Sequence, residues 1–405
     1  MVGAAARLGE VEPRERAGAQ TGRKYEYQYE RTARASLDLL VDSCKQVCVY
    51  CDWHDDYVAE VGDSPTRYVF HQVKGRSTSQ GPWSFSEFFG VRKKKSVVQS
   101  KTSPTAKLDA IVPRMLLHKT NFGVNCAGLV FVTNAGLDSS LSGFLDAIAK
   151  VGAENDLPKE EQVAFQHLVR AYVSASPPLV PSAAALFQCL SMVKVFTDQG
   201  QLENAEAGIL EIANLAVEFS EIDLRQRQAK QIARELVSQV RGKVAHSTTV
   251  VPASEDHLKR DKGIVTADLL NNLSLSVQAY EQLKAGASHE TVKTLSRLNR
   301  YCESHAMELH IVQICEFKTR WDVWRTVERH FIGTADFLLL ERKASDVIKA
   351  NLKIEDVIAE AKDIAAQFAS ITATPLTPEC VLGLIFSLAA QSEAPPGAQF
   401  AIGAR

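Results

Sequence analysis

The sequence predicts an α/β domain with a mixed central sheet flanked by helices, followed by an all-α domain. Short segments rich in Val, Tyr and Phe lie in the first half of the chain, and helical periodicity dominates after residue 264. A polar, interrupted stretch separates the two patterns. The length of 405 residues fits two or three domains.

Composition excludes several classes of protein. The chain carries 46 Lys and Arg against 48 Asp and Glu, a formal net charge of −2, which excludes a generally polycationic nucleic-acid coat but not a local basic patch. No apolar run approaches the roughly 18 residues of a membrane-spanning helix. Eight unevenly spaced cysteines and a beginning without an apolar signal core favour reduced thiols in the cytoplasm.

The first elements follow from changes of period. Residues 1–20 show no hydrophobic periodicity, so we expect a disordered leader. A helix is expected over 24–41, because apolar residues recur there every three or four positions. Strands are expected at 46–60 and 67–74, joined by a turn at Gly62-Asp63-Ser64-Pro65.

The later elements complete the predicted domains. We expect, in order, a helix at 105–118, strands at 128–133 and 192–196, and helices over 202–244. Beyond residue 264, apolar stripes over 269–283 and 354–368 indicate helices. The predicted boundaries are a leader at 1–20, the α/β domain at 21–245, a linker at 246–263, a helical domain at 264–392 and a flexible tail at 393–405.

The second strand of the expected hairpin carries candidate chemistry. Strand alternation places Gln72 and Lys74 on one face, and a turn centred near Ser64 places Asp56 opposite Gln72. Carboxylate and amide oxygens suit Mg²⁺ or Mn²⁺, and a lysine can position water and offset charge on a phosphate. The trio therefore suggests metal-assisted phosphodiester hydrolysis, although a solvated strand face produces the same residues more often.

Five short motifs in order carry a family resemblance. They are Gly22-Arg-Lys-Tyr-Glu-Tyr-Gln-Tyr29, Asp55-Asp56, His71-Gln-Val-Lys74, Trp83 and Phe131-Val-Thr-Asn-Ala135. Through these motifs the chain resembles the endonuclease domain of CD-NTase-associated effector nucleases, a branch of the PD-(D/E)xK superfamily. The resemblance covers residues 21–245.

The resemblance implies roles for single residues. Asp56 matches the metal-binding aspartate, Lys74 the catalytic lysine, and Gln28 the position that orients the site. Gln72 departs from the acidic residue usual in the superfamily and is expected as a second, neutral metal ligand. The further carboxylate that it lacks is left open among three candidates: Glu26, Glu30 and Asp55.

Basic residues that follow the hairpin are candidates for contact with DNA. Arg76 and the run Arg92-Lys93-Lys94-Lys95 could bind phosphates, although an isolated charge run is more often a solvated loop.

The expected function is a metal-dependent double-stranded DNA endonuclease effector of a bacterial antiphage defence system, held inactive until triggered. The pairing of a nuclease domain with a helical region resembles the nuclease subunit of Lamassu systems, which implies an SMC-like ATPase complex as partner and activation as a homo-oligomer.

Four other interpretations remain open at this stage. The chain could be an effector activated by a cyclic oligonucleotide, or a non-catalytic DNA-binding helical scaffold. Cys44, Cys48 and Cys51 have the spacing of a radical S-adenosylmethionine cluster loop, but a strand would send the last two to opposite faces. His305 and His310, near Cys302 and Cys315, suggest zinc without matching an established spacing.

Overall fold

A computed structural model describes most of the chain in two compact units. It covers residues 17–41, 44–62, 66–91, 107–173, 178–202, 204–222, 224–246, 254–273, 275–304, 311–328, 331–350 and 352–392. The first unit contains the chain up to Ala216 together with Gln226–Leu273, and the second contains Val217–Arg225 and the chain from Ser274 onward.

A mixed sheet forms the centre of the first unit. Its strands in the described residues are β1 (Gln46–Trp53), β2 (Asp55–Val61), β3 (Arg67–Lys74), β4 (Cys126–Thr133), β5 (Val193–Phe196) and β6 (Gly263–Val265). The spatial order is β5-β4-β3-β2-β1-β6; β3, β4 and β5 run parallel, and the other pairs are antiparallel. The predicted fold class is thereby confirmed.

The segment expected as one strand, 46–60, is two strands joined by a tight turn. Trp53 pairs with Asp55 across it, and Asp52 and His54 have positive φ angles of 48° and 66°. Sequence reasoning missed this turn because it contains neither glycine nor proline. Asp and His are among the non-glycine residues that adopt positive φ most often, which is why the chain can reverse here.

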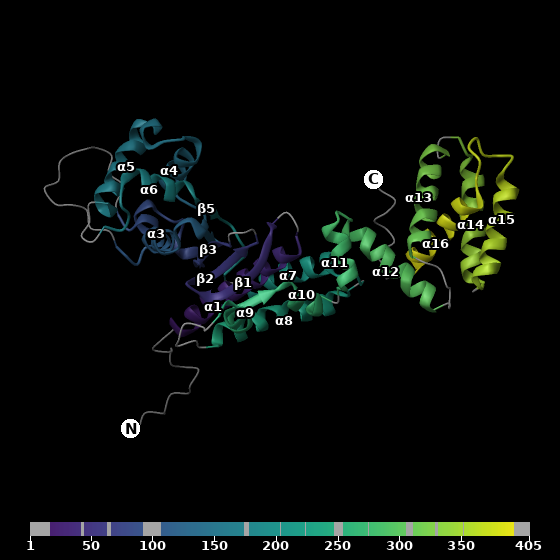
Figure 1. The fold of residues 1–405 in the computed structure, drawn as a ribbon, viewed down its shortest axis with the longest axis horizontal. Helices are drawn as coiled ribbons and strands as arrows, with labels where there is room; N and C mark the ends of the chain where they lie inside the picture. The colour runs from purple at the N-terminus through teal and green to yellow at the C-terminus, as the bar shows by residue number, and fades with distance from the viewer. Residues whose placement is uncertain are drawn as a thin grey trace, which may run out of the picture. The chain divides into compact units, whose positions relative to one another are not determined.

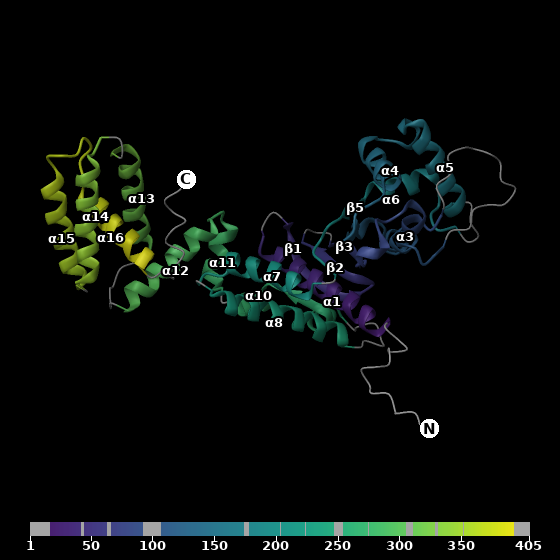
Figure 2. The ribbon, with the colours of Figure 1, turned by 180° about the vertical axis from the view of Figure 1, so that it is seen from behind.

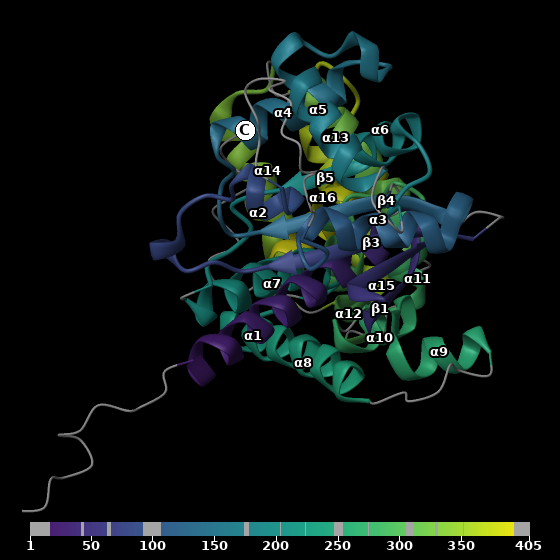
Figure 3. The same cartoon turned by 90° about the vertical axis from the view of Figure 1, so that its left-hand side faces the viewer.

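Helices cover both faces of the sheet. Those of the first unit are α1 (Ala17–Ser36), α2 (Phe85–Phe89), α3 (Ile111–Phe122), α4 (Ser139–Lys150), α5 (Lys159–Tyr172), α6 (Ala183–Ser191), α8 (Gln226–Ala245), α9 (Glu255–Lys262) and α10 (Thr266–Asn272), and α7 (Ala205–Phe219) contributes to both units. Figures 1 and 3 show α1 and α8 on one side of the sheet and α4, α5 and α6 on the other. Phe70, Phe88, Phe131 and Phe144 belong to the core beneath the second set.

The predicted linker, 246–263, is part of the first unit where the structure describes it. Residues 247–253 lie outside the described residues, but α9 follows directly and β6 then pairs with β1 through Val49 and Ile264. Ile264 is fully buried, so this segment completes the edge of the sheet. The units therefore divide after Leu273, ten residues later than the expected end of the linker.

The second unit is helical throughout its described residues, as predicted. Its helices are α11 (Val277–Lys284), α12 (His289–Ser304), α13 (Ile311–Glu328), α14 (Thr334–Lys349), α15 (Ile354–Phe368) and α16 (Pro378–Ser392). Figure 2 shows α13, α14 and α15 around α16. Trp321 and Trp324 stack in this core with ring centroids 5.2 Å apart, so their spacing reflects packing.

Of the two apolar stripes expected to be helical, one coincides with a single helix and the other does not. The stripe over 354–368 coincides with α15, whose Val357, Ala361 and Ile364 are buried. The stripe over 269–283 is interrupted, because α10 ends at Asn272 in the first unit and α11 begins at Val277 in the second.

The expected leader is partly helical, because α1 begins at Ala17; residues 1–16 and the tail 393–405 lie outside the described residues. Across the described residues, the structure contains no helix that is long and apolar enough to span a membrane.

Candidate nuclease site

Asp56 lies at the centre of a polar cluster where β2 and β3 meet α1. Its Oδ1 accepts a hydrogen bond from Gln28 Nε2 at 2.8 Å, and its Oδ2 accepts one from the Val73 amide at 2.6 Å. Lys74 Nζ lies 3.3 Å from the same Oδ2. The structure thus brings together three of the residues selected from the sequence: Asp56, Lys74 and Gln28.

The strand register explains how distant residues meet. Tyr57 pairs with His71 and Val58 with Phe70, which is the register expected for a turn near Ser64. The turn residues 63–65 are outside the described residues, but the ladder on both sides fixes the pairing. Gln28 also donates to the Val73 carbonyl at 3.1 Å, so α1 fastens the end of β3 beside Asp56.

Burial makes Asp56 a basic carboxylate. Burial raises the pKa of Asp56 to about 6, and Asp55 adds to the rise, while the Lys74 ammonium and the Val73 amide oppose it. A positive charge placed against this carboxylate would be favoured, because it offsets the cost of keeping a charge in a poorly hydrated place.

Gln72, which lies near these residues in the sequence of β3, is buried. It does not line the pocket described in the next paragraph. Its side chain is 3% exposed, and Oε1 finds no hydrogen-bond partner among the described residues. A buried carbonyl oxygen without a donor is uncommon in folded proteins and marks a place where an ion or water would be stabilised.

A pocket of about 470 Å³ opens in front of Asp56 and Lys74. One face of α1 forms a wall, contributing Thr21, Lys24, Tyr25, Gln28, Tyr29 and Thr32. These positions recur at three- and four-residue intervals, so they share one side of the helix. Asp52, at the tip of the β1–β2 hairpin, also lines the pocket. Sequence reasoning missed Asp52 because it missed the hairpin.

The three candidates for an additional carboxylate lie elsewhere. Glu26 and Glu30 are two positions from Gln28, about 200° around the helix, and therefore face away from the pocket. Glu26 pairs with Arg241 at 2.7 Å, and Glu30 packs against Gly208. Asp55 Oδ2 lies 3.0 Å from His118 Nε2 on α3. None of the three lines the pocket in the described residues.

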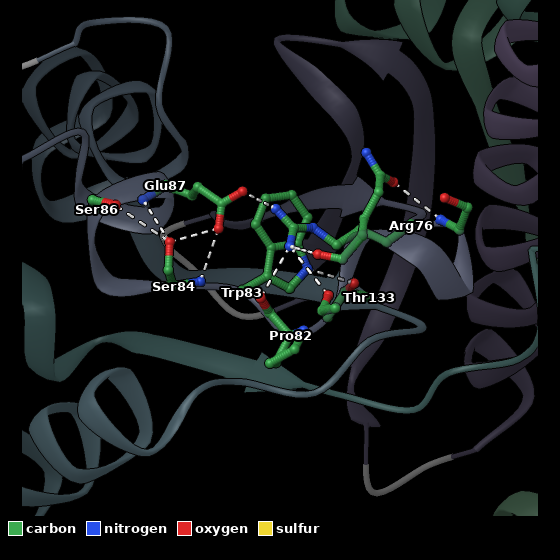
Figure 4. A network of polar contacts seen from close by, with 10 residues as sticks. Arg76, Pro82, Trp83, Ser84, Ser86, Glu87 and Thr133 are labelled. Atoms are coloured by element: carbon green, nitrogen blue, oxygen red, sulfur yellow. Dashed lines mark hydrogen bonds and ion pairs between the residues drawn. The ribbon is translucent and has the colours of Figure 1, made fainter.

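Arg76, expected to contact DNA, is the centre of a network of internal contacts, which we call the clamp. Its guanidinium is 7% exposed, donates to the carbonyls of Gln80, Gly81 and Pro82, pairs with Glu87 and lies 3.6 Å from the centre of the Trp83 ring. Figure 4 shows this network, with Glu87 also bonded to Ser84. Arg76 also lines the pocket in front of Asp56, so the network fixes this side chain at the wall of the site, and its contact with DNA stays a prediction.

The clamp explains two of the sequence motifs. Trp83 Nε1 donates to Thr133 Oγ1 at 2.9 Å, and Asn134 exchanges two hydrogen bonds with the backbone of Arg76, at 2.7 and 2.8 Å. The segment that leaves β3 directly after Lys74 is thereby fixed to the end of β4. Trp83 and Thr133-Asn134 therefore help to hold the shape of the site.

The structure describes some of the remaining candidate residues and not others. Cys48 and Cys51 lie on β1, and burial raises the pKa of each thiol to about 12, so neither is poised as a thiolate ligand. The described residues contain no group of three or more His, Cys, Asp or Glu that could hold a metal. The basic run 92–95, His305 and His310 lie outside the described residues.

A mixed sheet with an aspartate and a lysine in contact at the ends of neighbouring strands is the arrangement expected of a metal-dependent nuclease of the PD-(D/E)xK type. The family model described as Cap4, dsDNA endonuclease domain, matches residues 16–243. This is more than half of the chain, so the chain belongs to the Cap4 double-stranded DNA endonuclease family. The protein is a DNA endonuclease effector of antiphage defence, and the scaffold and radical-enzyme interpretations are excluded. A comparison with curated proteins finds no match.

Proposed function

We propose that the pocket in front of Asp56 cleaves double-stranded DNA with Mg²⁺ or Mn²⁺. The observation that carries the proposal is the 3.3 Å contact between Lys74 Nζ and the buried Asp56 carboxylate at the pocket wall. A bound divalent cation would supply a Lewis acid that stabilises negative charge on the scissile phosphate.

Asp56 and Gln72 are the residues that would hold this cation. Asp56 offers a carboxylate whose ionised form is disfavoured by burial, and Gln72 offers a buried carbonyl oxygen without a donor. Hard cations prefer such oxygen ligands and keep several waters. One charged and one neutral protein ligand leave most of the coordination shell to water and to phosphate oxygens.

Lys74 and Gln28 have separate tasks in this scheme. Lys74, one-third exposed, would hold the attacking water and offset charge on the phosphate. Gln28 would orient the Asp56 carboxylate, because it donates to Oδ1 and to the neighbouring Val73 carbonyl at once.

The wall formed by α1 is the proposed path of the DNA backbone. Lys24 and Tyr25 are exposed on the face that carries Gln28, so a cation and an aromatic ring lie beside the reacting groups. The run Arg92-Lys93-Lys94-Lys95 would add phosphate contacts, each of which should contribute about 0.9 to the slope of log affinity against log salt.

Control of the nuclease is assigned to the helical unit. We propose that the chain is the nuclease subunit of a Lamassu-type system, restrained on an SMC-like ATPase complex and activated by self-association. Exposed Val323 and Val327 are four residues apart on α13 and therefore share one side of that helix, which supplies an apolar surface for a partner. The helical character of the described second unit does not support an α/β sensor of cyclic oligonucleotides.

The test is cleavage of supercoiled plasmid by the purified protein with Mg²⁺, with EDTA as the metal-free arm. Lys74→Ala should lower the rate at least 100-fold, the usual contribution of a positioned catalytic group. Lys150→Ala, an exposed lysine at the end of α4, is the matched control and should cut normally. Full cleavage by folded Lys74→Ala protein would remove the proposed site.

A further inference from the structure

A second pocket, of about 250 Å³, lies in the first unit and shares no residue with the first pocket. Its walls are mainly aromatic side chains from three places in the chain: the tip of the β1–β2 hairpin, strand β3 and the end of α3. They are Trp53, His54, Tyr68, Phe70 and Phe122. Ser254, Glu255 and Leu258 of the α9 segment, together with Tyr50 and Val58 of the sheet, complete the lining. Nothing in the proposed nuclease reaction uses this pocket.

The rings of these walls stand at steep angles to one another. The planes of Trp53 and His54 meet at 71°, those of His54 and Phe122 at 82°, and those of Tyr68 and Phe122 at 67°. None of these three pairs is stacked in parallel, so they do not form the two facing rings between which a nucleobase is sandwiched. In such pairs the edge of one ring lies against the face of another, so the pocket is bordered by both ring edges and ring faces, an outline that suits a compact, rounded group better than a flat one.

The charge of the lining is acidic. Glu255 accepts a hydrogen bond from the Tyr68 hydroxyl at 3.4 Å, and its charge lies near enough to Lys259, one turn along α9, to help raise the pKa of that lysine. Glu60, a nearby carboxylate, is already satisfied by Lys259 at 3.0 Å and by the Tyr50 hydroxyl at 2.6 Å. The described lining contains neither lysine nor arginine, and Glu255 is its one carboxylate.

From this combination we propose that the pocket binds an organic cation through its alkylammonium head group. The ring faces attract a cation by their quadrupoles, and Glu255 supplies the opposite charge. The volume is below the range of about 300–1,000 Å³ typical of drug-sized ligands, so it suits one head group rather than a large molecule. The shared chemistry fits either a free methylated amine or a lysine side chain of another polypeptide.

Residues of the hairpin tip line both pockets. Asp52 and Asp56 line the nuclease pocket, and Trp53 and His54, between them in sequence, line the aromatic pocket. The binding proposal does not depend on the nuclease assignment, because it uses neither Asp56 nor Lys74.

Isothermal titration of the full-length protein with tetramethylammonium and with choline tests the proposal, at constant ionic strength. The neutral isostere of choline, 3,3-dimethylbutan-1-ol, separates charge from shape. We expect saturable binding of the cations and binding of the isostere weaker by about tenfold or more, in keeping with a desolvated cation–π contact. Equal binding of the isostere, or no saturable binding of any cation, would overturn the proposal.

Variants locate the site. Glu255→Gln should weaken cation binding about tenfold, whereas Glu235→Gln, an exposed glutamate on α8, should not. Trp53→Phe keeps a ring and a folded hairpin and should weaken binding less than Trp53→Ala. Unchanged binding in both Glu255→Gln and Trp53→Ala would contradict the assignment. Nα-acetyl-lysine methylamide distinguishes the sources: tighter binding than tetramethylammonium assigns the site to a polypeptide lysine, and weaker binding assigns it to a methylated amine.

Discussion

Asp56 and Asp55 are adjacent carboxylates with different surroundings. Asp56 contacts Lys74 and Gln28 at the pocket, whereas Asp55 is held by His118 on α3. Neighbouring residues on a strand point to different sides, so one position decides which carboxylate is available to a cation.

We therefore expect Asp56→Asn to abolish cleavage and to weaken Mn²⁺ binding at least tenfold, because the cation loses its charged ligand. Asp55→Asn should retain Mn²⁺ binding. Titration calorimetry measures the binding of Mn²⁺, and a plasmid assay measures cleavage by the same variants. If Asp55→Asn lost the metal while Asp56→Asn kept it, the ligand assignment would be reversed.

Glu30 gives a prediction about pH. Burial raises the pKa of Glu30 to about 7, although Arg31 and Arg23 oppose the rise. Between pH 4.5 and 7 the folded chain holds a proton that the unfolded chain has released, so stability should fall as pH rises through this window and stay low above it.

Glu30→Gln should remove the contribution of Glu30 to this dependence and stabilise the protein at pH 8 by on the order of 1 kcal/mol, with little effect at pH 4.5. Thermal unfolding at the two pH values measures the difference. Glu235→Gln, exposed on α8, is the control and should leave the pH profile unchanged. A stability loss at pH 8 in Glu30→Gln would show that the carboxylate is needed in its charged form.

At the scale of elements, the segment after β3 depends on the clamp around Arg76. The guanidinium donates hydrogen bonds to three carbonyls of the turn, and Trp83 lies against it. Because this segment begins one residue after Lys74, its shape controls where the lysine sits.

Arg76→Lys should lower stability by about 1–3 kcal/mol, since an ammonium cannot serve three carbonyls, Glu87 and a ring face together. Cleavage should fall through kcat, with little change in DNA affinity. Chemical denaturation and single-turnover kinetics measure the two effects, and Arg114→Lys, exposed on α3, is the control. A variant that lost DNA affinity but kept kcat would assign Arg76 to phosphate contact.

At the scale of the whole molecule, the proposed site acts on one strand of DNA. A double-strand break then requires two sites, and symmetric self-association is the usual way to supply them. Restraint by a partner would act by preventing this association.

We expect the rate of double-strand cleavage per molecule of full-length protein to rise with protein concentration. The rate of nicking per molecule should stay constant. The proposed partner complex should suppress the breaks. Light scattering in parallel reports the oligomer. Double-strand breaks at a concentration-independent specific rate, from a protein that scatters as a monomer, would exclude assembly as the switch. A fragment for comparison should end at Leu273, because an end at 245 would delete β6.

The sequence by itself determined the fold class, the β2–β3 register and the meeting of Asp56 with Lys74. These follow from local alternation and turn chemistry, which a single chain displays directly. Gln28 was found through a family motif, and the structure supplies its reason, a hydrogen bond to Asp56.

Only the tertiary structure decided which other charges reach the pocket. The orientation of Glu26 and Glu30 depends on how α1 is rotated against the sheet, and the burial of Arg76 depends on carbonyls, Glu87 and Trp83 that fold around it. The pairing of β6 with β1 also depends on long-range packing, because β6 carries no long apolar run. The hairpin at Trp53–Asp55 is a local turn, and it was missed because its sequence contains neither glycine nor proline. Contacts between residues far apart in sequence leave no local pattern, and for this reason they could not be predicted from the sequence.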